Sequence, residues 1–415
     1  MGATPNTTLP MSSILTKQIS LPRPRRPELR RPEFRRPSGS RPTLGGPEIS
    51  LPSFGRKKGD GGVVVGLEIE AGSVAAVEAR VDGAPQVVAA GVQPLAPEAF
   101  RDGEVAEPEA IAEALRALFD THKLSKRVRL GLANQRLVVR MLRLPMIESP
   151  EELDAAVRFS AQEQIAMPLD EAVIEHRVVG GVAASGDAPA QIDVMVVAAR
   201  REMILATLRP LRDAGLEPVG VDLSAFGMLR ALAELDAPLE HPDDEPLPAA
   251  DRGSILYCNV GDTTNLAVAR GRSCLFTRVS PVGLEDIAGG LASATGLSPE
   301  HANLWLNHVG LGRPAEEIEG DPSLVARTLE VLERGATSLV DELRLSLDFY
   351  AAQEAAVPVE RIVLCGPGSA IPGLAERMEP AAGLPIAIGR PAALGAYDAA
   401  TAARLTLPLG LALDL

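Results

Sequence analysis

Apolar positions along this chain fall into two similar blocks, each with three strand-like segments followed by helix-like segments. Short apolar or alternating runs bounded by turn residues predict β-strands. These runs span 63–70, 74–81 and 86–92 in the first block, and 254–260, 264–269 and 273–280 in the second. The turns between them are too short for a crossover helix, so consecutive strands should pair antiparallel. A repeated meander with helices after each copy predicts an α/β protein of two similar lobes with a cleft between them.

Helix signals complete both blocks. Ser149, Pro150 and Glu152 provide an N-cap, a first-turn proline and a capping-box acid, which predict a helix to about residue 165. A longer helix should begin near Asp321, because apolar residues follow it at core-facing spacing. Further strands are expected at 127–133, 137–144, 172–180, 192–199, 218–222 and 361–364.

The acidic, proline-rich stretch 236–252 separates the two blocks and predicts a linker or surface loop. We therefore expect a first lobe over 61–235 and a second over 253–394. The final segment, 395–415, should return to the first lobe.

Residues 1–60 form a tail of different composition, with proline at every fifth position from 22 to 52. The tail holds 12 Lys/Arg and 4 Asp/Glu, which gives it a net charge of +8. The rest of the chain holds 29 Lys/Arg and 51 Asp/Glu, a net charge of −22. Regular proline predicts a disordered segment with polyproline-II character. A solvated spacer, a segment for anionic lipid headgroups and a segment for an acidic partner all fit this composition. Nucleic acid is not expected as a partner, because the acidic body would repel phosphate.

Other features of composition narrow the class of protein. Hydrophobic residues make up 46% and aromatic residues only 3%, so aliphatic side chains should build an ordinary soluble core. No run approaches the roughly 18 apolar residues of a membrane span, and the first residues lack a signal-peptide core, which predicts a cytoplasmic protein. Cys258, Cys274 and Cys365 lack metal-ligand spacing, so we expect buried thiols and no intrinsic metal site.

Three turns carry the candidate chemistry, because the first turn of each meander should face the cleft and a glycine-rich turn follows a later strand. Gly261 permits close backbone approach, and the amides and hydroxyls beside it suit a phosphate group. The turn after residue 364 opens a helix, whose N-terminus is electropositive. Each turn alone also fits an ordinary structural turn, but their order along the chain favours a nucleotide site. The candidate nucleotide-binding residues are Gly72, Ser73, Gly261, Asp262, Thr263, Thr264, Gly366, Gly368 and Ser369.

These motifs, in this order, resemble the PilM family of type IV pilus assembly proteins, with the cell-division protein FtsA as the nearest relative in kind. Among the segments that carry the resemblance are GLEI at 66–69, LRLP at 142–145, NVGDTT at 259–264 and LCGPGS at 364–369. The resemblance covers about residues 62–413. It implies a bilobed actin-like (ribonuclease H-like) fold with an inserted small subdomain at about 136–198.

The resemblance also implies ligands and partners. Relatives bind ATP between the lobes, so ATP or ADP with Mg²⁺ is the expected cofactor. Relatives also hold the N-terminal cytoplasmic peptide of the inner-membrane protein PilN beside the inserted subdomain, which implies a location at the inner face of the cell membrane through that partner. The implied partner-binding residues are Arg143, Pro145, Ile165, Met167 and Pro168, although Ile165 equally fits a core position.

Four positions depart from the pattern usual in relatives. Glu70 and Pro367 stand where glycine is usual, Ala75 where lysine is usual, and Asn259 where aspartate is usual. A carboxylate about 4 Å from a phosphate charge costs roughly 4 kcal/mol at an effective dielectric constant near 20. An asparagine is a poorer partner for magnesium than an aspartate, although Asp262 lies nearby. The candidate catalytic residues are therefore Glu68, Asn259 and Asp262, and hydrolysis should be weak or absent.

Three functions fit the sequence. The first is a PilM-like scaffold with at most weak ATPase activity, and the second is an ATP-hydrolysing switch of the actin-like superfamily. The third, a sugar-kinase-like phosphotransferase, is disfavoured because no catalytic aspartate stands beside a substrate pocket. The oligomeric state, the identity of the membrane partner and the fibre that is assembled do not follow from the sequence.

Overall fold

The computed structural model describes residues 63–82, 84–182, 189–232, 253–271, 273–353 and 356–413. The chain divides into two units, Met1–Ile49 and Ser50–Leu415, and every element below belongs to the second. The predicted disordered tail and the predicted linker at 236–252 lie outside the described residues.

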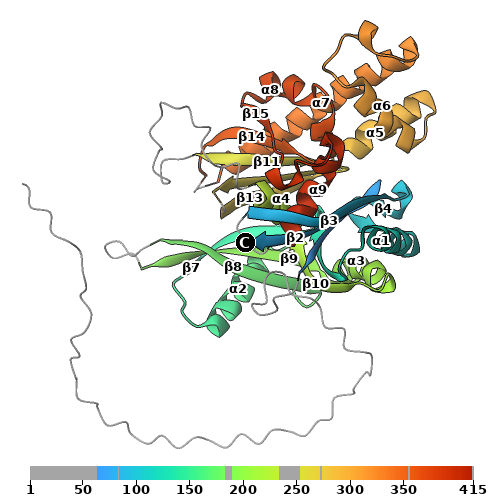
Figure 1. Ribbon diagram of the computed structural model, residues 1–415. Helices are drawn as coiled ribbons and strands as arrows, with labels where there is room; N and C mark the ends of the chain where they lie inside the picture. Colours follow the sequence, from blue (N-terminus) through green and yellow to red (C-terminus); the bar gives the residue numbers. More distant parts are fainter. Residues whose placement is uncertain are drawn as a thin grey trace, which may run out of the picture. The chain divides into compact units, whose positions relative to one another are not determined.

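Two five-stranded sheets form the centre of the fold (Figure 1). The first has the strand order β10 (Glu217–Leu223), β6 (Arg127–Leu132), β1 (Val65–Glu70), β2 (Ser73–Asp82) and β3 (Ala84–Pro94). The second has the order β13 (Ser273–Ser280), β12 (Thr264–Arg270), β11 (Ser254–Val260), β14 (Val359–Cys365) and β15 (Ile386–Ile388). In each sheet the first three strands of the block are antiparallel and the later two are parallel to the first strand. The predicted duplication is therefore confirmed.

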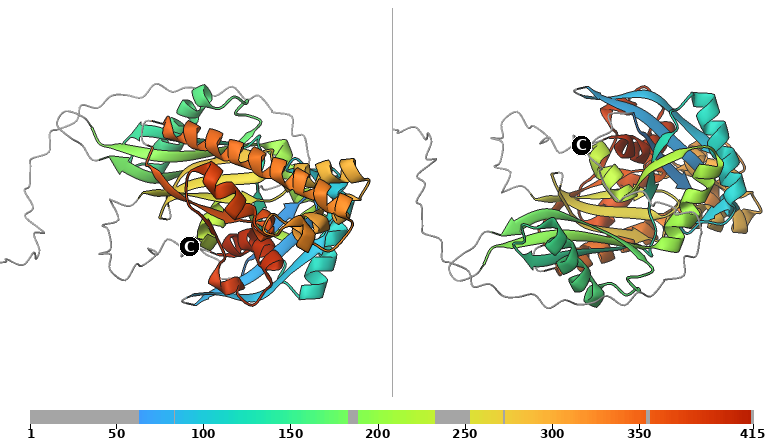
Figure 2. Two further views of the ribbon diagram at one scale, coloured as in Figure 1. Left: turned by 90° about the horizontal axis from the view of Figure 1, so that it is seen from above. Right: turned by 90° about the horizontal axis from the view of Figure 1, so that it is seen from below.

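Helices cover the sheets through the apolar stripes that their sequences predict. Helices α1 (Pro108–His122) and α3 (Arg201–Asp213) share one apolar cluster with the first sheet. In the second lobe, α5 (Leu284–Thr295), α6 (Pro299–Val309), α7 (Pro322–Ala351) and α8 (Leu374–Ala382) share a cluster with the second sheet. The long orange helix in Figure 2 is α7, which begins where Asp321 accepts hydrogen bonds from the amides of Ser323 and Leu324.

Two further helices lie between the sheets. Helix α9 (Ala399–Ala412) packs against β1, β2 and α4 (Ser224–Leu232), so the end of the chain lies beside its first strands (Figure 2). Glycines permit this approach, since a Cβ at Gly410 would lie 1.7 Å from the carbonyl oxygen of Gly227. The two helices therefore meet backbone to backbone.

A third, three-stranded sheet has the order β7 (Val138–Pro145), β9 (Gln191–Arg200) and β8 (Ala172–Val182). Helix α2 (Pro150–Gln164) covers one face and buries Val157 and Ala161 against it. Its N-cap is the predicted one, because the Ser149 hydroxyl accepts from the amide of Glu152 at 3.3 Å. From the other face, Met195 and Val197 join an apolar cluster that also holds side chains of α4, β11 and β12.

A short hairpin of β4 (Phe100–Arg101) and β5 (Glu104–Val105) completes the first lobe and was not predicted from the sequence. Its turn uses positive φ angles of 52° at Asp102 and 75° at Gly103. Among the described residues, no helix is long and apolar enough to cross a membrane.

Candidate functional site

The first turns of the two meanders meet directly. The amide of Ala71, at the β1–β2 turn, donates a hydrogen bond to a carboxylate oxygen of Asp262, at the β11–β12 turn. A Cβ at Gly261 would lie 2.2 Å from Oε1 of Glu70, so that carboxyl group rests against the backbone of the second turn. The structure therefore places two of the three predicted turns in contact.

The third turn lies against the end of β11. Gly366 has a φ of 76°, and a Cβ there would lie 2.3 Å from the side-chain oxygen of Asn259. Gly368 packs against Val260, and the hydroxyl of Ser369 donates to the carbonyl of Gly366 at 2.7 Å. This turn is thus held close to the cleft through contacts within its own lobe.

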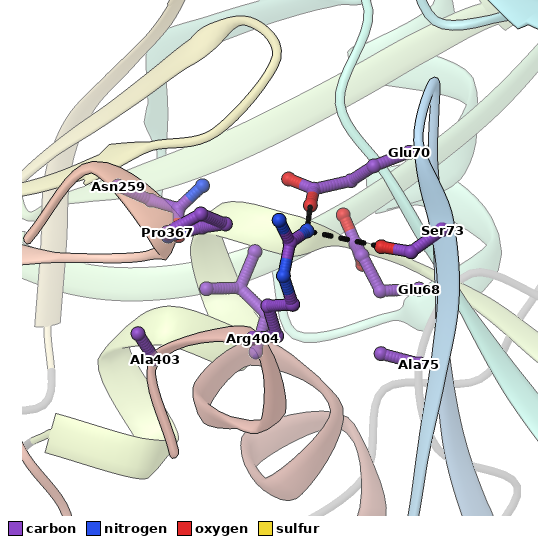
Figure 3. A pocket seen from close by; sticks show the side chains of 9 residues that line it. Glu68, Glu70, Ser73, Ala75, Asn259, Pro367, Ala403 and Arg404 are labelled. Carbon is purple, nitrogen blue, oxygen red and sulfur yellow. Dashed lines mark hydrogen bonds and ion pairs between the residues drawn. The ribbon is translucent and has the colours of Figure 1, made fainter. Parts of the chain in front are cut away.

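Two cavities flank the meeting point of the turns. The smaller one is lined on its polar side by Glu68, Glu70, Ser73, Asn259 and Arg404 (Figure 3). The larger one has the polar or charged lining residues Glu68, Glu70, Asp102, Asn259, Asp262, Thr263, Asn265 and Glu285.

The candidate residues divide into two groups by their position. All three candidate catalytic residues line a cavity, as do Ser73 and Thr263. The hydroxyl of Thr264 is buried and donates to the carbonyl of Val282 at 2.7 Å, so it stabilises the second lobe. The remaining glycines shape the turns without lining either cavity.

Carboxyl groups dominate the electrostatics of this site. Burial raises the pKa of Glu68 to about 7, against the lowering effect of a hydrogen bond from the Ser224 hydroxyl at 2.7 Å. Burial, with the negative charge of Asp262, raises the pKa of Glu70 to about 8. Burial also raises the pKa of Asp262 and of Glu285. The site therefore favours protonated carboxyl groups or a nearby cation.

Arg404 of α9 supplies such a cation. Its guanidinium NH1 lies 3.8 Å from Oε2 of Glu70 and donates to the hydroxyl of Ser73 at 3.1 Å (Figure 3). Sequence reasoning missed Arg404, because it expected residues 395–415 to return to the first lobe but gave no sign of which side chain reaches the first hairpin.

Asn265 is a second residue that sequence reasoning missed. Both polar atoms of its side-chain amide are buried with no hydrogen-bond partner in the described part of the chain, and the residue lines the larger cavity. Buried amides are normally paired, so an unpaired one indicates a site for water or for a polar ligand.

These residues fit a nucleotide with Mg²⁺ in part. The amide of Asn265, which has no partner among the described residues, suits a polar ligand, and the carboxylate oxygens suit Mg²⁺. The negative charge of an ionised Glu70 would repel a phosphate group bound between the turns. Among the described residues, no group of three or more His, Cys, Asp or Glu side chains has the arrangement of a metal site.

The predicted partner-binding residues lie on the three-stranded sheet and after α2. Arg143, on β7, is exposed, and its Nε donates to the Asp193 carboxylate at 2.8 Å. Pro145 and Pro168 are exposed and Met167 is half-buried. Ile165 is buried in the core of this subdomain, which agrees with its alternative reading as a core residue.

Two meanders of matching topology, with their first turns meeting at a lined cleft, define a bilobed α/β protein of the actin-like class. The chain matches the family described as type IV pilus assembly protein PilM over residues 66–405, and it belongs to that family.

The chain is also similar to several solved structures. A structure described as the PilM-PilN type IV pilus biogenesis complex is similar at a TM-score of 0.68 and 27% sequence identity, over 84% of this chain and 97% of that chain. The ethanolamine utilization protein EutJ from Carboxydothermus hydrogenoformans matches at a TM-score of 0.46 and 14% identity, over 86% of this chain and 91% of that one. MreB5 of Spiroplasma citri bound to AMPPNP matches at a TM-score of 0.44 and 12% sequence identity, over 85% of this chain and 95% of that chain.

Proposed function

We propose that this protein is a scaffold of the type IV pilus machinery that docks the N-terminal cytoplasmic peptide of a PilN-like inner-membrane protein. The observation that carries the proposal is the likeness to the PilM-PilN complex, which spans 97% of that chain. The proposed docking edge comprises the exposed residues Arg143, Pro145 and Pro168 with the half-buried Met167. Binding there holds the protein at the inner face of the cell membrane through its partner.

Peptide binding tests this proposal directly. The probe is a labelled peptide of the N-terminal cytoplasmic segment of a PilN-like protein from the same organism, and fluorescence anisotropy gives its Kd. We expect Arg143→Ala to weaken binding about tenfold, since a charged contact contributes roughly 1–2 kcal/mol. Arg209→Ala is the matched control, because Arg209 is an exposed, ion-paired arginine on α3 outside the inserted subdomain. Absence of binding by the wild type, or equal affinity of the two variants, contradicts the proposed docking edge.

We further propose that the cleft binds ATP or ADP with Mg²⁺ and turns it over slowly or not at all. Support for binding comes from the first two turns, which line the larger cavity, and from the amide of Asn265, which has no partner among the described residues. The third turn contributes Pro367 to the smaller cavity. Support for slow turnover comes from Asn259, whose neutral amide stands at the end of β11 where a carboxylate would hold the metal more strongly.

A thermal-shift titration with Mg-ATP and Mg-ADP, together with measured phosphate release, tests this second part. A ligand at 100 times its Kd stabilises the folded state by about 2.7 kcal/mol. We expect a shift with both nucleotides and no steady phosphate release. Tight binding with steady turnover would instead favour an ATP-hydrolysing switch, for which Glu68 and Asp262 are the candidate catalytic carboxylates.

A further inference from the structure

The charge balance of the cleft is unusual for a site that takes phosphate. Arg404 is the only basic side chain among the described residues that line the two cavities, whereas five lining residues are acidic: Glu68, Glu70, Asp102, Asp262 and Glu285. An anion in the cleft therefore has one side-chain cation available to it, and that cation comes from α9.

The Arg404 guanidinium makes only a long ion pair with Glu70. Its 3.8 Å contact with Glu70 is long, since charge-assisted hydrogen bonds between such groups measure about 2.7–2.9 Å. The guanidinium side chain keeps 32% exposure, and its hydrogen bond to Ser73 reaches the same turn that carries Glu70. Arg404 can therefore change partner without unfolding α9.

The carboxyl group of Glu70 lies where an anion would be bound. One oxygen faces the Arg404 guanidinium, and the other rests against the backbone at Gly261 on the opposite lobe. It thus touches the backbone of the second turn and the available cation, which are the groups that a phosphate between the turns would use.

We propose that the Glu70 carboxylate is a tethered competitor for the anion position of the cleft, and that Arg404 binds the phosphate groups of a nucleotide once Glu70 is displaced or neutralised. The inference rests on the proposed nucleotide binding and adds its regulation. Glu70 and Arg404 then act as an internal gate, in which the ion pair between them is exchanged for one between Arg404 and phosphate.

The gate is sensitive to pH because of the groups that face Glu70. These are Glu68 on β1, Asp262 on the second turn, Arg404 on α9 and the buried thiol of Cys365 on β14. Burial and the two carboxyl groups raise the pKa of Glu70 to about 8, while Arg404 lowers it. As the pH falls from 9 towards 7.5, Glu70 gains a proton and releases Arg404, so phosphate affinity rises.

Titration calorimetry on the full chain, with pyrophosphate, ADP and adenosine as probes, tests the gate. At pH 9 we expect Glu70→Gln to bind pyrophosphate and ADP about tenfold more tightly than wild type, and the ratio of the two affinities to shrink as the pH falls below 8. Arg404→Ala should abolish that gain when combined with Glu70→Gln. Adenosine, which has no phosphate, should bind all variants equally. The matched control is the exposed ion pair of Arg377 and Glu333, 2.6 Å apart between α8 and α7, removed by Arg377→Ala.

The outcomes separate this inference from the proposed scaffold function. Unchanged pyrophosphate affinity in Glu70→Gln, or a gain that survives loss of Arg404, overturns the gate even if the PilN-like peptide still binds. A gain that depends on Arg404 supports the gate even if the peptide fails to bind. Should Arg404→Ala unfold, Arg404→Lys keeps the charge but not the planar fork, and a reduced gain in that background is expected.

Discussion

Glu68 is a buried carboxyl group whose ionisation should limit stability at neutral pH. Its side chain is withdrawn from solvent in the first sheet, and the only hydrogen bond given to it in the described part of the chain comes from Ser224. Burial raises its pKa from 4.5 to about 7. At about 1.4 kcal/mol per pKa unit, ionised Glu68 costs the folded state roughly 3 kcal/mol.

The sign of the effect follows from the direction of this shift. Below pH 4.5 Glu68 is protonated in both states, so it contributes no penalty. As the pH rises from 4.5 through about 7, the unfolded chain ionises first, and the free energy of unfolding falls. Glu68→Gln, which mimics the protonated acid, should match wild type near pH 4.5 and exceed it by roughly 3 kcal/mol above pH 8.

Urea unfolding followed by circular dichroism between pH 4.5 and 9 measures this difference. Glu70 and Asp262 titrate in the same region, so the quantity of interest is the difference between the variant and wild type at each pH. Ser224→Ala is the companion variant, because loss of its hydroxyl should raise the pKa of Glu68 further and extend the loss of stability to higher pH. A constant difference between Glu68→Gln and wild type across the range would refute the reasoning.

Three further predictions concern packing and the tail. Gly410→Ala places a methyl group against a backbone carbonyl of α4 and should lower the free energy of unfolding by about 2–3 kcal/mol, whereas Gly72→Ala, which meets no atom within 4 Å, should change it by less than about 0.5 kcal/mol. Equal denaturant midpoints for the two would contradict the α4–α9 contact. Val157→Ala should cost about 2 kcal/mol and speed amide exchange in α2, while Phe159→Ala, 71% exposed on the same helix, should leave exchange unchanged. Removal of residues 1–60, with their net charge of +8, should reduce cosedimentation with anionic liposomes, and equal binding with and without them would exclude a lipid role.

The sheets could be predicted from the sequence because their information is local. Alternating apolar residues and short turns specify a meander within about 30 residues, and the Ser149 cap specifies where α2 begins. The approach of the first two predicted turns could also be predicted, because each of these turns directly follows the first strand of its meander.

The charge environment of the cleft could not be predicted in this way. Arg404 reaches Ser73 from the far end of the chain, and the partnerless amide of Asn265 becomes visible only when neighbouring strands are placed. Asp102 lines the larger cavity through a two-residue hairpin turn that leaves no periodic pattern. A pattern of hydrophobic residues predicts strands and helices, but it does not predict which single polar side chains come together from distant parts of the chain.

The three-stranded sheet has apolar packing on both faces, and this affects how the inserted subdomain behaves. Met195 and Val197 on its inner face belong to the same apolar cluster as Tyr257 of the second lobe. Excision of residues 136–198 would therefore uncover part of the core of the remaining protein, so the subdomain is not a removable module. A peptide bound at its outer edge would therefore contact a subdomain whose inner face shares an apolar core with the second lobe.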